Sequence, residues 1–256
     1  MELRTLASGS SGNCILLSHK GVHLLVDAGI SCKRILSGLR EAGADPAGLA
    51  GILITHEHSD HIAGLSTLTK RLGIPVYTSP GTTRQLIRRM AWPAGLLRAL
   101  PPGEVFDIGP FQGVGFATSH DAEESMGFSL SCEGRRAAVA TDLGYVSQQV
   151  LEGVLGAHLL VCEANHDVEL LRMGKYPYHL KRRILGEQGH LSNEAGAELA
   201  LRCVEAGAHT VLLSHLSEEN NTPALALGAA KAALAGHGDI RVAVSPRHEL
   251  SPLYEV

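Results

Sequence analysis

Aromatic residues are scarce in this sequence, and the features that mark membrane and secreted proteins are missing. Phe, Trp and Tyr together make up 4% of the 256 residues, so the core must consist mainly of Leu, Val, Ile and Ala. No stretch approaches the roughly 18 uninterrupted apolar residues of a membrane-spanning helix. The N-terminal residues lack the basic region and apolar run of a signal peptide. The sequence therefore predicts a protein that neither spans a membrane nor carries a secretion signal.

Cysteines are few, and their spacing suggests no pairing. The five of them are scattered along the chain, and none belongs to a C-x-x-C pair. Cysteines used in this way are typically small buried hydrophobic residues in a reducing compartment, which predicts a cytoplasmic location. Linkers, low-complexity tracts and short-period repeats are also missing, and the chain is long enough to bury a substantial core. We therefore expect one domain that spans residues 1–256.

An excess of positive charge is absent as well. The formal net charge is −4, whereas general nucleic-acid binders are usually basic. Bound divalent cations would weaken this argument, because an anionic substrate responds to the field inside its cleft rather than to the total charge. Hydrophobic residues at 45% and charged residues at 19% are otherwise ordinary for a globular enzyme.

Short apolar runs alternate with turn signals along the chain. Both halves begin with several strands and continue with strand–helix alternation, so two sheets packed face to face with helices outside would bury the apolar runs. The prediction is therefore an α/β protein. Strands are expected at residues 3–7, 14–17, 23–26, 51–54, 75–78, 113–118, 127–132, 136–140, 158–162, 209–213 and 241–244. Helices are expected at residues 31–42, 62–72, 147–155, 180–187, 193–206 and 223–235, with another from residue 80.

The strongest chemical signal is an H-x-H-x-D-H sequence directly after a predicted buried strand. It contains His56, His58, Asp60 and His61. Imidazole is a good ligand for zinc, manganese and iron, and carboxylate suits harder ions. His56 and His58 face one side of an extended backbone while the other two point elsewhere, so this loop can serve two ions. A solvated polar loop is the competing interpretation, and this residue set at this spacing disfavours it.

This cluster resembles the signature of the metallo-β-lactamase fold superfamily. Four further residues match its other motifs in the right order, each at or near the end of an apolar run: Asp27, His120, Asp142 and His215. Alone, each would more often be a structural residue. The resemblance covers essentially the whole chain and implies a four-layer αββα fold with two β-sheets between helices.

The resemblance also implies a set of ligands for two divalent ions. Asp142 would bridge the ions, with a hydroxide between them as the nucleophile. Asp27 would either orient the cluster loop from behind the ligands or cap a buried turn. The ligands of the first ion would be His56, His58 and His120, and those of the second Asp60, His61 and His215.

Asp142, Glu163 and His190 indicate which enzymes of the superfamily this sequence resembles most. Asp142 stands where classical β-lactamases of this fold carry a cysteine, which points instead to phosphodiesterases, lactonases or thioesterases. Glu163 and His190 resemble a pair in ribonuclease Z-like enzymes. The resemblance implies that His190 protonates the leaving group while Glu163 holds it, and Asp60 completes the expected catalytic residues. Alternatively, Ser192 caps the following helix and His190 merely packs.

Several local strings resemble the YycJ/WalJ family of small bacterial proteins still more closely. They include LASGSSGN at residues 6–13, CEANHD at 162–167, HLSN at 190–193 and SHLS at 214–217. Members of that family are regarded as 5′–3′ DNA exonucleases connected with mismatch repair. The resemblance implies DNA as the substrate and manganese, zinc or iron as the metal. His166, within the second string, would contact phosphate or metal, or simply pack.

Basic residues near His190 are the candidates for DNA contacts. Lys181, Arg182 and Arg183 cluster shortly before it, and Tyr178 offers a ring for stacking. Arg84 and Arg88 share a predicted helix face, although such charge runs often mark solvated surfaces.

Two alternatives to a DNA exonuclease stay open. One is a small-molecule hydrolase on the same fold, such as a cyclic phosphodiesterase or a lactonase. The other is a non-catalytic metal-binding partner, which the complete ligand set disfavours. A long groove lined by Arg88 and Arg182 would favour a polymer substrate, whereas a closed pocket would favour a small molecule.

Overall fold

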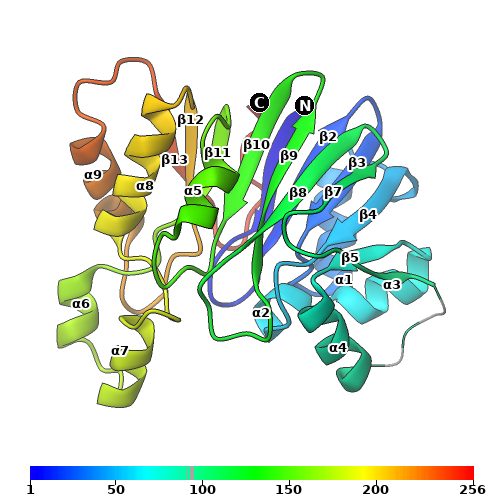
Figure 1. Cartoon of the computed structure of the whole chain (residues 1–256), viewed down its shortest axis with the longest axis horizontal. Coiled ribbons are helices and arrows are strands. Elements are labelled where there is room, and N and C mark those ends of the chain that lie inside the picture. Colours follow the sequence, from blue (N-terminus) through cyan, green and yellow to red (C-terminus); the bar gives the residue numbers. More distant parts are fainter. Residues whose placement is uncertain (91, 93–94) are drawn as a thin grey trace.

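The computed structural model describes residues 1–90, 92 and 95–256, and over these residues two seven-stranded sheets lie face to face (Figure 1). The first sheet has the order β14-β1-β2-β3-β4-β5-β6, antiparallel from β14 to β3 and parallel from β3 to β6. Its strands are β1 (Glu2–Ala7), β2 (Cys14–His19), β3 (Val22–Val26), β4 (Leu49–Leu53), β5 (Val76–Thr78), β6 (Leu97–Ala99) and β14 (Tyr254–Glu255).

The second sheet mirrors this arrangement. Its order is β13-β12-β11-β10-β9-β8-β7, parallel from β13 to β10 and antiparallel from β10 to β7. Its strands are β7 (Val105–Ile108), β8 (Phe111–Ala117), β9 (Met126–Cys132), β10 (Arg135–Ala140), β11 (Leu159–Glu163), β12 (Thr210–Ser214) and β13 (Arg241–Val244).

Helices cover the outer faces of both sheets. Against the first sheet pack α1 (Cys32–Glu41), α3 (Leu65–Leu72) and α4 (Pro80–Arg89). Against the second pack α5 (Gln148–Val154), α8 (Asn193–Glu205) and α9 (Pro223–Ala233). The remaining helical segments are the 3₁₀ turn η1 (Pro46–Gly48), α2 (Ser59–Ile62), α6 (Val168–Met173) and α7 (Tyr178–Ile184).

Three apolar layers result from the alternation of side chains along the strands. In β3, Leu24 and Val26 face the second sheet, whereas Leu25 faces the helices on the outside. In β11, Leu159 packs between the sheets and Leu160 packs under α8. Both faces of these central strands are therefore buried, which explains their continuous apolar sequences. The predicted α/β class and four-layer αββα architecture are confirmed.

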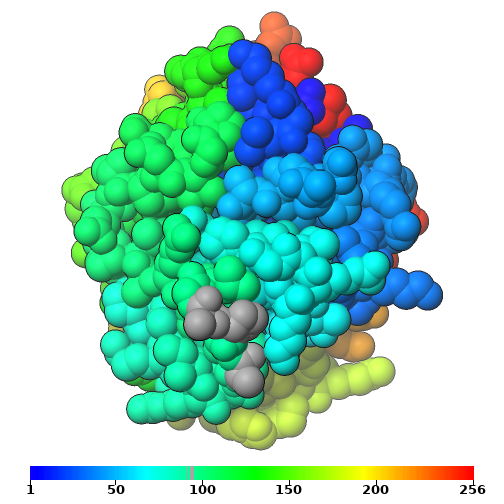
Figure 2. All heavy atoms as spheres, turned by 90° about the vertical axis from the view of Figure 1, so that its right-hand side faces the viewer, coloured from blue at the N-terminus to red at the C-terminus, as the bar shows by residue number. Residues whose placement is uncertain are grey.

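The two short helices α6 and α7 project from one end of the sandwich, the end at which α2 and α4 also lie (Figure 1). Viewed from the side that bears α3 and α4, the blue-to-green first half of the chain forms most of the surface, and the yellow-green α6–α7 segment reaches past its lower edge (Figure 2). None of the described helices is both long and apolar enough to cross a membrane.

Several sequence predictions of secondary structure are wrong in detail. The helix expected at residues 62–72 is divided into α2 and α3, because the Gly64 amide donates to the Ala28 carbonyl at 2.9 Å instead of to a carbonyl within the helix. The helix expected at residues 180–187 is α7, which begins and ends earlier. Five of the described elements were not expected: the strands β6, β7 and β14, the helix α6 and the 3₁₀ turn η1.

Candidate metal centre and active site

The loops that follow the parallel strands of both sheets meet at one end of the sandwich. Neighbouring parallel strands end at the same edge, so the residues after β3, β10 and β12 are brought together. Three of these residues, Asp27, Asp142 and His215, have φ values of 62°, 60° and 59°. This left-handed conformation is uncommon for residues other than glycine and costs roughly 1–3 kcal/mol, and it recurs at active sites. The fold therefore holds these side chains against their local backbone preference.

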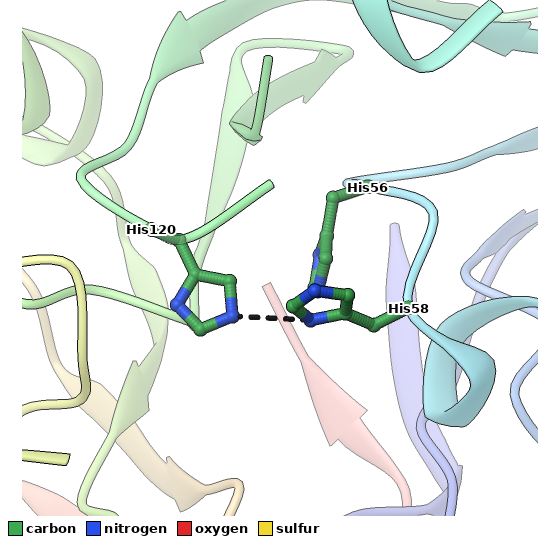
Figure 3. A group of neighbouring side chains, drawn as sticks. All are labelled: His56, His58 and His120. Atoms are coloured by element: carbon green, nitrogen blue, oxygen red, sulfur yellow. Dashed lines mark hydrogen bonds between the residues drawn. The ribbon is translucent and has the colours of Figure 1, made fainter. Parts of the chain in front are cut away.

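The first group of donors consists of His56, His58 and His120, whose ligand atoms lie within 4.8 Å of one another (Figure 3). His120 Nε2 is 3.3 Å from His58 Nδ1. The outer ring nitrogens are held from behind: His56 Nδ1 contacts the Thr55 hydroxyl at 3.0 Å, and His120 Nδ1 contacts the Gly189 carbonyl at 3.1 Å. His56 and His120 therefore present Nε2 to the centre.

The second group consists of Asp60, His61 and His215. Asp60 Oδ2 lies 3.3 Å from His61 Nε2 and 3.4 Å from His215 Nε2. The other nitrogen of His61, Nδ1, is 2.7 Å from Asp27 Oδ2. Asp27 also accepts hydrogen bonds from the Thr55 amide and hydroxyl, so it orients the cluster loop from behind.

Asp142 lies between the two groups. One carboxylate oxygen is 3.4 Å from His61 Nε2, and the other is 3.6 Å from His120 Nε2. The side chain is buried, and its Oδ2 has no hydrogen-bond partner among the described residues. The structure thus brings all seven predicted ligands into one cluster, with Asp142 at its middle.

Glu163, the last residue of β11, orients two histidines at once. Its Oε1 accepts hydrogen bonds of 2.8 Å from Nδ1 of both His190 and His215. Its Oε2 accepts from the backbone amides of Leu143 and Leu191 at 2.9 and 3.0 Å. The carboxylate is fully buried with both oxygens satisfied. His190 uses Nδ1 for this bond and lines the pocket beside the site.

The two donor groups differ in electrostatics. Burial lowers the pKa of His56 and of His120, which keeps these rings neutral. Burial acts the same way on His61, but the carboxylates around it, led by Asp27, outweigh it and raise its pKa. Burial is likewise outweighed at His215, where Asp142, Asp60 and Glu163 raise the pKa to about 10. Without an ion, the second group therefore binds protons at neutral pH.

Several residues that contact the predicted ligands were not identified from the sequence. The side-chain nitrogen of Asn13 lies 3.2 Å from His61 Nε2, and the Ser8 hydroxyl accepts a 2.8 Å hydrogen bond from the His215 amide. Both belong to the LASGSSGN string, which was the available clue. Asn165 donates to the His215 carbonyl at 2.9 Å.

Glu57 and Asp121 were also missed, although each stands next to predicted ligands. The Glu57 carboxylate accepts hydrogen bonds from the Glu123 amide and the Thr82 hydroxyl, which ties the cluster loop to α4. Asp121 Oδ1 lies 3.4 Å from His120 Nε2. The side chain of each is fixed by residues remote in sequence, so the motif alone could not reveal it.

The residues predicted to contact DNA lie on α7, at the rim of the site, but not all of them are free. Arg183 donates a hydrogen bond from Nε to Asp121 Oδ2, and Lys181 donates to the Arg172 carbonyl at 2.7 Å. The guanidinium of Arg182 lies 6.0 Å from the centre of the Tyr178 ring, and that tyrosine is 76% exposed.

The second predicted basic group, on α4, is partly neutralised. Arg84 pairs with Glu123 at 3.4 Å, and Arg89 donates to the Glu57 carbonyl at 2.6 Å. A pocket of about 170 Å³ opens beside His120 and His190, and neither Arg88 nor Arg182 lines it. A larger cavity of about 520 Å³ lies at the opposite end of β1–β3 and has none of the predicted site residues in its lining.

His166 is buried, and neither ring nitrogen has a hydrogen-bond partner among the described residues. Burial lowers its pKa to about 4, so the ring is neutral. It belongs to none of the donor groups found in the described part of the chain. The structure does show its backbone carbonyl accepting from the Asn193 amide at 2.9 Å, which joins the loop after β11 to the start of α8.

Comparison with known proteins agrees with this geometry. Residues 23–216 match the model of the β-lactamase superfamily domain. The chain is 38% identical to exodeoxyribonuclease YycJ of Bacillus anthracis over 227 residues, which cover 88% of this chain and 86% of that protein. It is 40% identical to exodeoxyribonuclease WalJ of Streptococcus pneumoniae serotype 2 over 229 residues, which cover 86% and 83%.

A solved structure shows the same fold over the full length. The metallo-β-lactamase fold protein YhfI of Bacillus subtilis superposes with a TM-score of 0.75 at 17% sequence identity and covers 99% of both chains. The chain therefore belongs to the β-lactamase superfamily and, within it, to the family of the YycJ and WalJ exodeoxyribonucleases.

Proposed function

We propose that the protein is a binuclear metal-dependent phosphodiesterase that degrades DNA from its 5′ end. The observation that carries this proposal is the arrangement of two donor groups around Asp142, with His190 held on Glu163 beside them. The relatives support DNA as the substrate, because both are named exodeoxyribonucleases. They do not favour the alternative of a small-molecule hydrolase.

The residues present fit two divalent ions. His56 Nε2 and Asp142 Oδ2 are buried without a hydrogen-bond partner in the described part of the chain, and such polar atoms are costly unless something satisfies them. Imidazole and carboxylate donors suit manganese, zinc or iron. His56, His58 and His120 would hold the first ion, Asp60, His61 and His215 the second, and Asp142 both.

When bound, the two ions would lower the pKa of a water molecule between them and stabilise negative charge on the phosphate oxygens. The protein's own contribution is to place these groups and to move a proton. His190 Nδ1 donates to Glu163, so Nε2 is the nitrogen that gives its proton to the leaving oxygen. Glu163 remains an anion throughout, because its histidine partners overcome the effect of burial and hold its pKa at about 2.

The α7 helix is the proposed contact surface for DNA. Lys181, Arg182 and Tyr178 lie on it at the rim of the site, where they would contact phosphates and an end base. Both sheets supply ligands, so we take residues 1–256 to act as one catalytic domain. Five free buried cysteines are compatible with action on cytoplasmic DNA.

The direct test compares linear duplex DNA with covalently closed circular duplex of the same sequence, in the presence of manganese. The proposal expects the linear form to be degraded and the closed form to be spared. An Asp142→Asn variant serves as the inactive control, because it removes the shared ligand. Rapid turnover of lactones or cyclic nucleotides with both DNA forms left intact would contradict a nuclease function.

A further inference from the structure

The pocket beside His190 lies where the departing part of a substrate must sit. It has a volume of about 170 Å³, and His120, His190 and Asp121 form the side nearest to the donor groups. Tyr176, Leu180 and Arg183, from α7 and the segment before it, also line the pocket. We infer that this pocket binds the nucleoside part of the 5′-terminal nucleotide that the enzyme releases, with Tyr176 as the stacking surface for its base. This inference rests on the function proposed above.

The chemistry of cleavage places the terminal nucleotide on the His190 side. Water attacks the phosphorus between the first and second nucleotides, and the bond from phosphorus to the 3′-oxygen of the first nucleotide breaks. The electron pair stays on that 3′-oxygen, which takes a proton from His190 Nε2. The products are a nucleoside 5′-monophosphate with a 3′-hydroxyl and a strand with a new 5′-phosphate. The group beside His190 is therefore the terminal nucleotide itself.

The size of the pocket favours a single unit of a polymer. Sites that enclose drug-sized molecules typically measure about 300–1,000 Å³, and this pocket is smaller, at about 170 Å³. The expected products are therefore mononucleotides released one at a time.

The charge of the lining favours a nucleoside over a phosphate group. The guanidinium of Arg183 is already paired with the Asp121 carboxylate, and Ser10, Asn165 and Gln188 add neutral polar groups. Asp121 Oδ1 lies 3.4 Å from His120 Nε2, on the side of the pocket next to the first donor group. Its negative charge would repel a phosphate dianion but not a neutral nucleoside.

Tyr176 is the tyrosine of this lining, and its ring offers a surface on which a base of any sequence can stack. The test measures binding of thymidine and of thymidine 5′-monophosphate by calorimetry. Tyr176→Ala should weaken both by roughly 5- to 150-fold, the loss that follows removal of a base-stacking ring. Tyr176→Phe should retain binding. The matched control is His179→Ala, a ring on the exposed surface of α7 that does not line the pocket, and it should also retain binding.

Gln188→Ala provides a second variant at an exposed position of the lining, in case loss of the tyrosine prevents folding, and it should also weaken thymidine binding. Inorganic phosphate should bind all variants equally, and an effect of Tyr176→Ala on phosphate as large as that on thymidine would overturn the nucleoside assignment. If wild-type protein degrades linear DNA while both lining variants bind thymidine like His179→Ala, only the pocket assignment fails. If wild-type protein leaves linear DNA intact, the proposed function fails and the pocket assignment fails with it.

Discussion

Five of the six histidines of the site, all except His58, use one ring nitrogen to hold their position and leave the other without that partner. A hydrogen bond from behind fixes both the rotation of a ring and which nitrogen faces the cavity, and it raises the basicity of a ligand. The partners are varied in kind: a hydroxyl, a backbone carbonyl and two carboxylates. They pair as His56 with Thr55, His120 with Gly189, His61 with Asp27, and His190 and His215 with Glu163.

The role of His190 can be separated from that of the ligands. His190→Ala should slow DNA cleavage by roughly 10²–10⁴, the usual cost of losing a general acid, while metal content stays unchanged. Hydrolysis of bis(p-nitrophenyl) phosphate should suffer far less, because its leaving group departs without a proton. Kinetics on both substrates, with elemental analysis, check this. Equal losses on both would rule out proton donation by His190.

Glu163→Gln gives the complementary prediction at this scale. A glutamine has one side-chain oxygen and one nitrogen, so it cannot accept from two histidines through one oxygen and from two amides through the other as Glu163 does. It should therefore weaken metal binding through His215 as well as proton transfer through His190. Metal titration of this variant beside His190→Ala tests the difference, and identical metal affinity in the two would contradict a dual role.

At the scale of elements, the cluster loop packs backbone to backbone against the segment after β3. A Cβ at Gly29 would lie 1.6 Å from the Asp60 carbonyl oxygen. Two carbonyls of the same loop accept hydrogen bonds of 2.8 Å, that of Asp60 from the Asn13 amide and that of His61 from the Ala28 amide. The position of the ligands on the cluster loop therefore depends on position 29 having no side chain.

Gly29→Ala should displace the cluster loop. Overpacking of this kind costs roughly 1–3 kcal/mol or more in the free energy of unfolding, and binding of the second ion should weaken with it. Gly228→Ala, in α9, is the matched control: a Cβ at this position would have no neighbouring atom within 4 Å, so the change should stabilise the protein by about 0.5–1 kcal/mol. Denaturant unfolding measures the stability of both variants, and metal titration measures their affinity for the second ion. A Gly29→Ala protein with wild-type stability and wild-type metal affinity would disprove the packing argument.

The α7 helix carries basic residues of two kinds. Lys181 and Arg182 lack carboxylate partners among the described residues, whereas Arg183 pairs with Asp121 beside the ligand His120. Replacing Lys181 and Arg182 together by Ala should raise KM for DNA and make the salt dependence of binding shallower by up to about one unit of log–log slope per lost contact. Hydrolysis of the small diester should not change. Arg183→Ala should slow the hydrolysis of both DNA and the small diester, because it also removes the ion pair that holds Asp121.

At the scale of the whole molecule, ligands from two sheets create two half-sites of different proton affinity. In the metal-free protein, burial keeps His56 and His120 neutral, while carboxylates keep His61 and His215 protonated, with the pKa of His215 at about 10. An ion must displace these protons from the second half-site, and affinity there rises as pH increases toward that pKa. His56 and His120 of the first half-site carry no such protons.

Metal content should therefore depend on pH in two steps. At one fixed concentration of free manganese, we expect one ion per chain near pH 6 and two at about pH 8.5, since each displaced proton costs up to tenfold in affinity per pH unit. Asp60→Ala should keep the first ion and lose the second at both pH values. Elemental analysis after desalting measures the stoichiometry, and parallel loss of both ions on acidification would contradict this order.

Much of this protein could be read from its sequence. Apolar runs with strand and helix periodicity determined the four-layer architecture, because central strands buried on both faces must be apolar throughout. The local spacing in H-x-H-x-D-H pointed to a metal site, and the position of Asp142 and His215 after such strands placed them at the same edge. The short strands β6 and β14 were not predicted. They have only three and two residues, and they form because strands distant in sequence pair with them.

The tertiary structure alone decided how the site residues are used. The resemblance to ribonuclease Z-like enzymes predicted His190 and Glu163 as a pair, but only the fold shows that the same carboxylate also holds His215. The fold also pairs Arg183 with Asp121 and places residues of α7 in the lining of the pocket. The physical reason is that a hydrogen bond or ion pair depends on distances of about 3 Å between residues far apart along the chain. No local pattern encodes those distances, which arise only when two sheets pack and their loops meet at one edge.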